Sequence, residues 1–183
     1  IMIGLIIGIT VGVVILGGIF LYNSVIRLKN QVDNSWAQID VQLKRRFDLI
    51  PNLIETVKGY AKHEKEVLST VTKARTEFLS AKTVEDKAKA DNHLNETLKS
   101  LFAVSESYPD LKANQNFLQL QEELAGTESK IAYARQLYND TVMEFNTKIE
   151  TFPNNIFANM FKFTKRQLFE TDKEERKNVK VQF

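Results

Sequence analysis

Residues 1–31 read "IMIGLIIGITVGVVILGGIFLYNSVIRLKNQ", a stretch in which the first charged side chain is Arg27. As a helix, the apolar run over residues 1–22 rises about 33 Å at 1.5 Å per residue, which matches the roughly 30 Å hydrocarbon core of a bilayer. A secretory signal peptide would have a basic start and a shorter apolar core of about 7 to 15 residues. We therefore expect a transmembrane helix over residues 1–22 that is retained in the mature protein, with Tyr22 at the membrane interface, where aromatic residues collect.

Three glycines of this run, Gly4, Gly8 and Gly12, are spaced four residues apart, so they lie on one face of the helix. In lipid, small residues at this spacing let two helices approach closely, and the association depends on van der Waals contact. The alternative is that glycine is simply common in membrane spans. The spacing favours packing of the span against a second copy through these three glycines.

The composition of the chain argues against several functional classes. The 183 residues have a net charge of +2, with both signs interleaved, which gives no support to nucleic-acid binding. Neither His63 nor His93 belongs to a metal-ligand motif, and no glycine-rich phosphate loop is present. Glu128 falls near an apolar helix face, and the basic run at residues 44–46 is its expected ion-pair partner. We expect no catalytic site, no metal site and no cofactor.

After the span, apolar residues recur every three or four positions, as they do in amphipathic helices, and no stretch alternates with a period of two. The stripe of the first helix keeps its phase across Pro51, which favours a kink over a break. We predict an all-α fold in which the transmembrane helix continues into an up-and-down four-helix bundle over residues 23–152. Its two long and two short helices are expected at about 23–61, 63–81, 84–107 and 113–152, followed by an amphipathic segment at 153–170 and a charged tail at 171–183.

The unequal helix lengths predict an exposed apolar surface. The two short helices can cover only part of the two long ones, so the membrane-proximal half of the long pair is expected to lack a partner within the chain. An uncovered apolar stripe usually marks a protein interface, here a coiled-coil contact between copies. The expected interface residues are Leu28, Val32, Trp36, Ile39, Leu43, Phe47, Ile131, Tyr138 and Phe145.

The stretch "NNIFANMFKFTKRQLFE" at residues 154–170 mixes aromatic and basic side chains, as interfacial amphipathic segments do. In an up-and-down bundle the fourth helix ends on the membrane side, which brings this stretch to the bilayer surface. The alternative is that the aromatic residues cap the bundle core. The predicted membrane-surface contacts are Phe157, Met160, Phe161, Lys162, Phe163, Lys165 and Arg166.

Three stretches resemble the LemA family of bacterial membrane proteins. They are "SWAQIDVQLKRRFDLIPNLIETVKGYAKHEKEV", "YPDLKANQNFLQLQEELAGTESKIAYARQLYNDTVMEFN" and "FPNNIFANMF". The resemblance implies an amino-terminal membrane helix followed by a membrane-tethered four-helix bundle. It implies no established enzymatic activity.

These expectations lead to one main functional hypothesis and two alternatives. Arg27 and Lys29 follow the span while no Lys or Arg precedes it, so the positive-inside rule predicts a single-pass protein of the bacterial inner membrane with the amino terminus outside and the bundle in the cytoplasm. The main hypothesis is a non-catalytic scaffold that forms homo-oligomers in the lipid bilayer. The first alternative is a tethered adaptor that binds another membrane protein, and the second is an enzyme.

Overall fold

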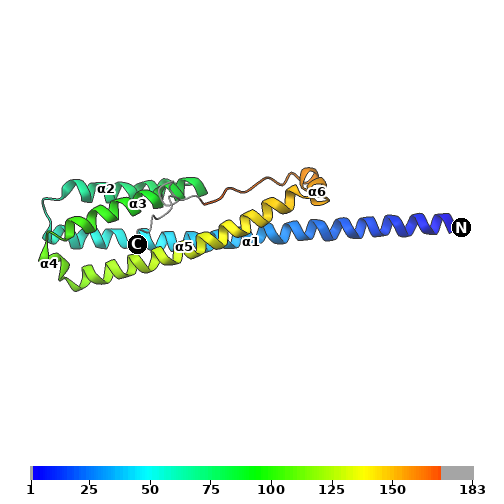
Figure 1. The fold of residues 1–183 in the computed structure, drawn as a ribbon. Helices are drawn as coiled ribbons and strands as arrows, with labels where there is room; N and C mark the ends of the chain where they lie inside the picture. Colours follow the sequence, from blue (N-terminus) through cyan, green and yellow to red (C-terminus); the bar gives the residue numbers. More distant parts are fainter. Residues whose placement is uncertain (1, 170–183) are drawn as a thin grey trace, which may run out of the picture. The chain divides into compact units, whose positions relative to one another are not determined.

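The computed structural model describes residues 2–169, and every regular element in that range is an α-helix (Figure 1). The all-α fold is therefore confirmed. The predicted charged tail at 171–183 lies outside the described residues. The helices are α1 (Met2–Tyr60), α2 (Lys65–Ser80), α3 (Val84–Ser105), α4 (Pro109–Lys112), α5 (Gln115–Glu150) and α6 (Asn154–Met160).

Helix α1 runs without a break from the apolar lead into the polar body over 59 residues. Pro51 lies inside it and is exposed, so its ring is on the side of the helix that faces away from the core. The buried positions on either side, Ile50 and Leu53, have no exposed surface. A continuous apolar stripe thus keeps α1 helical past a residue that removes one backbone hydrogen bond.

The described residues fall into two compact units. The first unit contains residues 2–38 and 136–167, and the second contains residues 39–135 with 168–169. Both α1 and α5 contribute to each unit, whereas α2, α3 and α4 belong to the second and α6 to the first.

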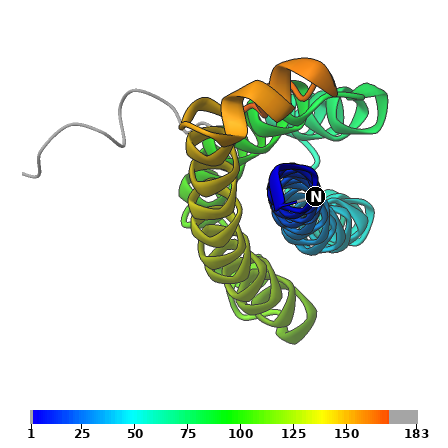
Figure 2. The same ribbon diagram turned by 90° about the vertical axis from the view of Figure 1, so that its right-hand side faces the viewer.

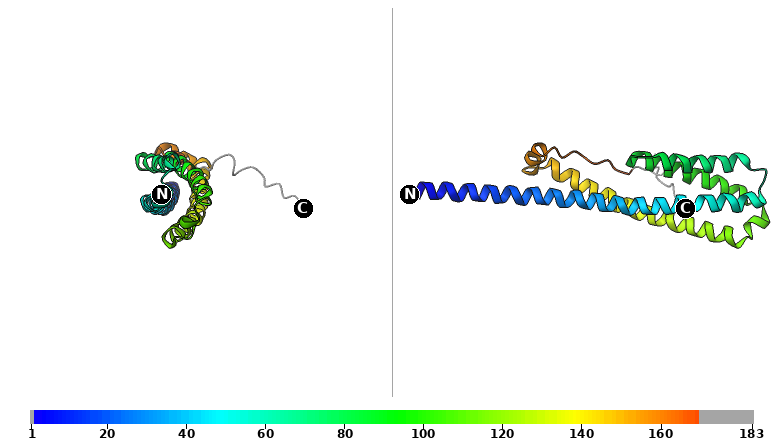
Figure 3. Two further views of the ribbon diagram at one scale, coloured as in Figure 1. Left: turned by 90° about the vertical axis from the view of Figure 1, so that its left-hand side faces the viewer. Right: turned by 180° about the vertical axis from the view of Figure 1, so that it is seen from behind.

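In the second unit, α2 and α3 form a helical hairpin whose helices lie side by side in Figures 1 and 3. Thr83 begins α3, because its hydroxyl accepts a hydrogen bond of 3.0 Å from the backbone N–H of Asp86. Aromatic contacts join the hairpin to the long helices. The ring of Phe78 on α2 stacks on Phe47 of α1 at 3.9 Å, and other apolar side chains fill the core around them.

A buried polar group crosses this core. Arg46 of α1 is only 2% exposed, and its guanidinium donates to Asp91 Oδ1 at 3.0 Å and to Asn95 Oδ1 at 2.6 Å, both on α3. Burial raises the pKa of Asp91, and the charge of Arg46 opposes that shift. The expected partner, Glu128, is 3.6 Å from Arg46, but its side chain is 58% exposed. The predicted ion pair is present at the edge of the core, and the buried partners on α3 were not predicted.

In the first unit, residues 161–167 follow α6 as a turn at 161–162 and then a stretch without regular secondary structure, and we call these residues the return segment. Figure 2 shows α6 coming directly after the end of α5. Asn146 of α5 holds the return segment through both backbone groups of Arg166, accepting from its N–H at 2.8 Å and donating to its carbonyl at 3.0 Å. The hydroxyl of Tyr138 donates to the carbonyl of Gln167 at 2.8 Å, and the Arg166 side chain reaches Asp33 of α1 at 3.1 Å.

The expected uncovered stripe is not found, and this prediction is wrong. Trp36 is half-buried and its ring lies 5.6 Å from that of Tyr138. The sequence analysis had assigned the cover of this stripe to a second copy of the chain, but in the first unit the return segment is hydrogen-bonded to both α5 and α1. In the second unit α3 reaches as far as Asp40, which pairs with Lys87. The stripe residues that are buried within the chain are Leu28, Val32, Ile39, Leu43, Phe47, Ile131, Tyr138 and Phe145.

Replacing Asn146 with Ala should release the return segment. The change removes two hydrogen bonds worth about 1 kcal/mol each, so the open population should rise by roughly tenfold or more. Tryptic cleavage after Lys165 and Arg166, followed by mass spectrometry of the full chain in mild detergent, measures this opening. Gln136→Ala, at an exposed position of α5, is the control and should leave the rate unchanged. Equal rates in both variants would contradict the role given to Asn146.

Candidate membrane-interface site

The amino-terminal part of α1 is apolar and uncovered. Every large apolar side chain from Met2 to Phe20 is exposed. Within residues 2–169, α1 is the one helix that is long and apolar enough to cross a membrane. A soluble surface rarely carries so large an apolar area, so these side chains require lipid or another chain around them.

An aromatic cluster forms where this apolar part of α1 ends. The ring of Tyr22 lies 4.7 Å from that of Phe161 and 6.2 Å from that of Phe163, with tilted ring planes. Such tilted pairs are favourable beyond the area they bury. The cluster joins the first polar turn of α1 to the carboxyl end of α6 and the beginning of the return segment.

Gly18 permits a close approach of α6 to α1. A Cβ atom at this position would lie 3.2 and 3.3 Å from two ring carbons of Phe157, which is tighter than ordinary van der Waals contact. At the neighbouring Gly17, a Cβ atom would meet nothing within 4 Å. The absence of a side chain at Gly18 therefore lets the Phe157 ring rest on the α1 backbone.

A shallow apolar groove of about 420 Å³ runs between α1 and α6. Val14, Ile15 and Ile19 line it from α1, and Met160 lines it from α6. No charged side chain is among its lining residues. Because one wall belongs to the apolar span, the groove suits a hydrocarbon environment better than water.

The predicted membrane-surface residues divide into two groups. Met160 and Phe161 are exposed, at 62% and 49%, whereas Phe157, beside Gly18, and Phe163, in the aromatic cluster, are half-buried. Among the cationic residues, Lys162 is exposed and has a left-handed backbone with φ of 56°. Lys165 pairs with Glu150 at 2.5 Å and Arg166 with Asp33 at 3.1 Å, so these two charges are partly neutralised by the chain itself.

The three span glycines have open space beside them. A Cβ atom at Gly4, Gly8 or Gly12 would meet nothing within 4 Å. Within residues 2–169, this face of α1 is therefore free for contact with another helix.

Two features of the site were missed by the sequence analysis. The role of Gly18 was hidden, because five glycines in one apolar run show no sign of which one meets a side chain from residue 157. The pairing of Tyr22 with Phe161 joins residues far apart in the sequence, and only the placement of α6 reveals it. The residues described contain no group of three or more His, Cys, Asp or Glu that is arranged to hold a metal ion.

Gly18→Leu should displace α6, because its side chain would occupy the space of the Phe157 ring. Ala158 is buried on α6, and the chain has no cysteine, so Ala158→Cys gives a unique thiol whose modification reports displacement. In mild detergent, reaction with a water-soluble maleimide should be about tenfold faster in Gly18→Leu, which corresponds to about 1.4 kcal/mol of destabilisation. Gly17→Leu should leave the rate unchanged. The same rate in both variants would show that the Gly18 contact does not hold α6.

Sequence comparisons place the chain among known proteins. The sequence profile of the LemA family matches residues 35–183. Protein LemA of Metamycoplasma hominis is 30% identical over 162 residues, which span 86% of this chain and 72% of that protein. Magnetosome proteins MamQ 1 and MamQ 2 of Paramagnetospirillum magneticum are each 23% identical over 175 residues, or 81% of this chain and 64% of theirs. The alignment therefore spans less than two thirds of each MamQ protein.

These relatives agree with the apolar α1 lead in indicating a membrane-associated protein, and none of their names describes an enzyme. The resemblance noted in the sequence is confirmed, since the profile match takes in most of the chain and the LemA relative is similar over most of its own length. On this evidence the chain belongs to the LemA family.

Proposed function

We propose that this protein is a non-catalytic, membrane-anchored scaffold that assembles with itself through its transmembrane helix. The observation that carries the proposal is the contrast along α1. Its large apolar side chains from Met2 to Phe20 are all exposed, whereas from Val25 to Val57 the apolar stripe is buried within the chain and only Val41 and, beyond it, Tyr60 are exposed large apolar side chains of α1. The surface left for partners in a membrane is therefore the span itself.

The glycine face is the part of the span best suited to contact between copies. Gly4, Gly8 and Gly12 lie along one side, with open space at each position. Two helices that meet at such a face can bring their backbones close, which increases van der Waals contact in lipid. The stripe from Leu28 to Phe47 no longer supports a second interface, because its side chains are buried in the chain.

In this proposal α6 lies at the bilayer surface. It packs on α1 at Gly18 and Tyr22, where the apolar span ends, and it exposes Ile156 and Met160. A short amphipathic helix with exposed apolar side chains gains free energy when those side chains enter the headgroup region. Arg27 and Lys29, which follow the span, support a cytoplasmic position for the helical body and an external amino terminus in a bacterial inner membrane.

Gly8→Leu should weaken self-assembly, because a bulky side chain separates the two backbones on the glycine face. Native mass spectrometry of the purified full chain in mild detergent measures the number of copies per particle. Gly17→Leu is a matched control, since it lies nine residues away and thus on the opposite side of the helix at 100° per residue. The proposal requires a multimer in the wild type and in Gly17→Leu, and smaller particles in Gly8→Leu. A wild-type monomer that binds another protein only in membrane extracts would instead support the adaptor hypothesis.

A fluorophore attached at Met160→Cys should lie within the bilayer when the full chain is reconstituted in vesicles. Brominated lipids quench fluorophores that contact acyl chains, so strong quenching is expected at this position. Ser129→Cys, at an exposed position of α5, is the control and should be quenched little. Equal and weak quenching at both positions would remove α6 from the membrane surface.

A further inference from the structure

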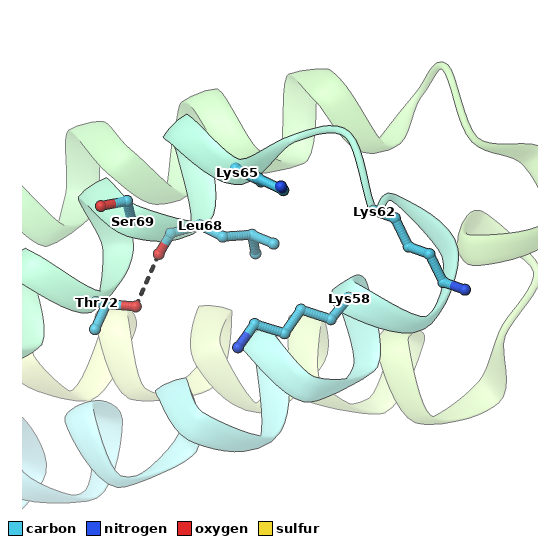
Figure 4. A pocket seen from close by; sticks show the side chains of 6 residues that line it. All are labelled: Lys58, Lys62, Lys65, Leu68, Ser69 and Thr72. Carbon is cyan, nitrogen blue, oxygen red and sulfur yellow. Dashed lines mark hydrogen bonds between the residues drawn. The ribbon is translucent and has the colours of Figure 1, made fainter.

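A hollow of about 480 Å³ lies in the second unit where α1 ends and α2 begins. Lys58 of α1, Lys62 of the connecting turn and Lys65 of α2 line it, together with Leu68, Ser69 and Thr72 (Figure 4). Its volume is within the range of about 300 to 1,000 Å³ that is typical of small-molecule sites. Figure 4 shows Leu68 between Lys65 and Lys58, with Lys62 directed away from the hollow.

The lining of this hollow has positive charge without a matching negative charge. All three lysines are exposed, and none of them has an ion-pair partner within 4 Å among residues 2–169. Elsewhere in the chain Lys89, Lys112 and Lys165 each pair with a glutamate. No carboxylate is among the lining residues. Lys58 and Lys65 carry positive charge beside the hollow and Lys62 adds a third charge at its edge, so an anion in the hollow would be attracted by all three.

The acidic residues nearby in the sequence do not line the hollow. The carboxylate of Glu64 accepts a hydrogen bond of 2.9 Å from the hydroxyl of Tyr108. Glu66 lines a separate hollow that also contains His93 and Glu96. Glu55 is exposed on α1 but is not a lining residue. Residues 2–169 therefore leave the charge of the three lysines to solvent or to a ligand.

Lys65 lies where α2 adds further positive charge to the hollow. It is the first residue of α2, where the backbone N–H groups give the helix a partial positive charge. A lysine there is unfavourable for the helix by itself. Glu64, at the N-cap, makes no side-chain capping bond, because its carboxylate is used by Tyr108. An anion between Lys58 and Lys65 would offset both the lysine repulsion and the helix charge.

We propose that this hollow binds an anion that carries phosphate groups. Lys58 and Lys65 would hold the phosphate oxygens through charge-assisted hydrogen bonds, and Lys62 can turn toward them on its flexible side chain. The Thr72 hydroxyl already donates to the carbonyl of Leu68 at 2.8 Å, so Ser69 is the hydroxyl left to donate to the ligand. Leu68, which is only 5% exposed, forms an apolar floor that suits a ligand with a carbon skeleton. The phosphate can come from a soluble compound or from a lipid headgroup.

Titration of the full chain with pyrophosphate, in nanodiscs of phosphatidylcholine alone, tests the soluble source. The triple variant Lys58→Gln, Lys62→Gln, Lys65→Gln should bind at least about tenfold more weakly than the wild type, since each lost ammonium removes a charge-assisted bond. The matched control is Lys44→Gln, Lys73→Gln, Lys130→Gln, which removes the same charge at exposed positions that do not line the hollow. Its affinity should stay within about twofold of the wild type, because distant exposed charges are screened by salt.

The lipid source is tested by adding vesicles that contain about 30 mol% phosphatidylserine, whose charge attracts basic surfaces, and by measuring their capture of the nanodiscs. Capture that is lost in the hollow variant and kept in the control variant supports the proposal with a headgroup as the ligand. Weaker pyrophosphate binding in the hollow variant alone supports it with a soluble ligand. The proposal is wrong if the two triple variants behave alike in both measurements while their circular dichroism matches that of the wild type.

Discussion

Helix α1 has apolar side chains along its length but needs two different surroundings, lipid around its first part and protein around the stripe that follows. From Met2 to Phe20 its side chains are exposed in the chain, and from Val25 to Ala61 the stripe is buried by protein. In lipid the exposed part of α1 has no unfavourable free energy of solvation, because acyl chains are as apolar as the side chains. In water, by contrast, each Å² of apolar surface that is buried stabilises the fold by about 25 cal/mol. The other helices are arranged around the part of α1 that must avoid water.

Much of the helical arrangement was predictable because it depends on local patterns. The apolar stripe across Pro51 and the recurrence of apolar residues every three or four positions each specify a helix from neighbouring residues. The structure has helices close to the expected positions. The apolar span was equally clear, because length and lack of charge are properties of one segment.

The errors concern contacts between segments that are distant in the sequence. Residues 161–167 have no helical period, so their hydrogen bonds to α5 and α1 could not be expected from the sequence. Asp91 was not recognised as the partner of Arg46, because an acidic residue in a charged helix gives no sign of burial until α3 is placed. The same reason hid the contact of Phe157 with Gly18. Each of these contacts depends on how segments far apart in the sequence are placed in the fold.

The way in which the return segment is attached allows it to move separately from α1 and α5. Its backbone is held by the side chains of Asn146 and Tyr138 and makes no repeating ladder with another strand or helix. Such a segment can detach as a small cooperative element while α1 and α5 keep their internal hydrogen bonds. Its amides should therefore exchange with solvent through local opening at a free energy well below that of global unfolding. Detachment would break the hydrogen bonds to Asn146 and Tyr138, so these bonds contribute to the free-energy difference between the closed and open forms of the first unit.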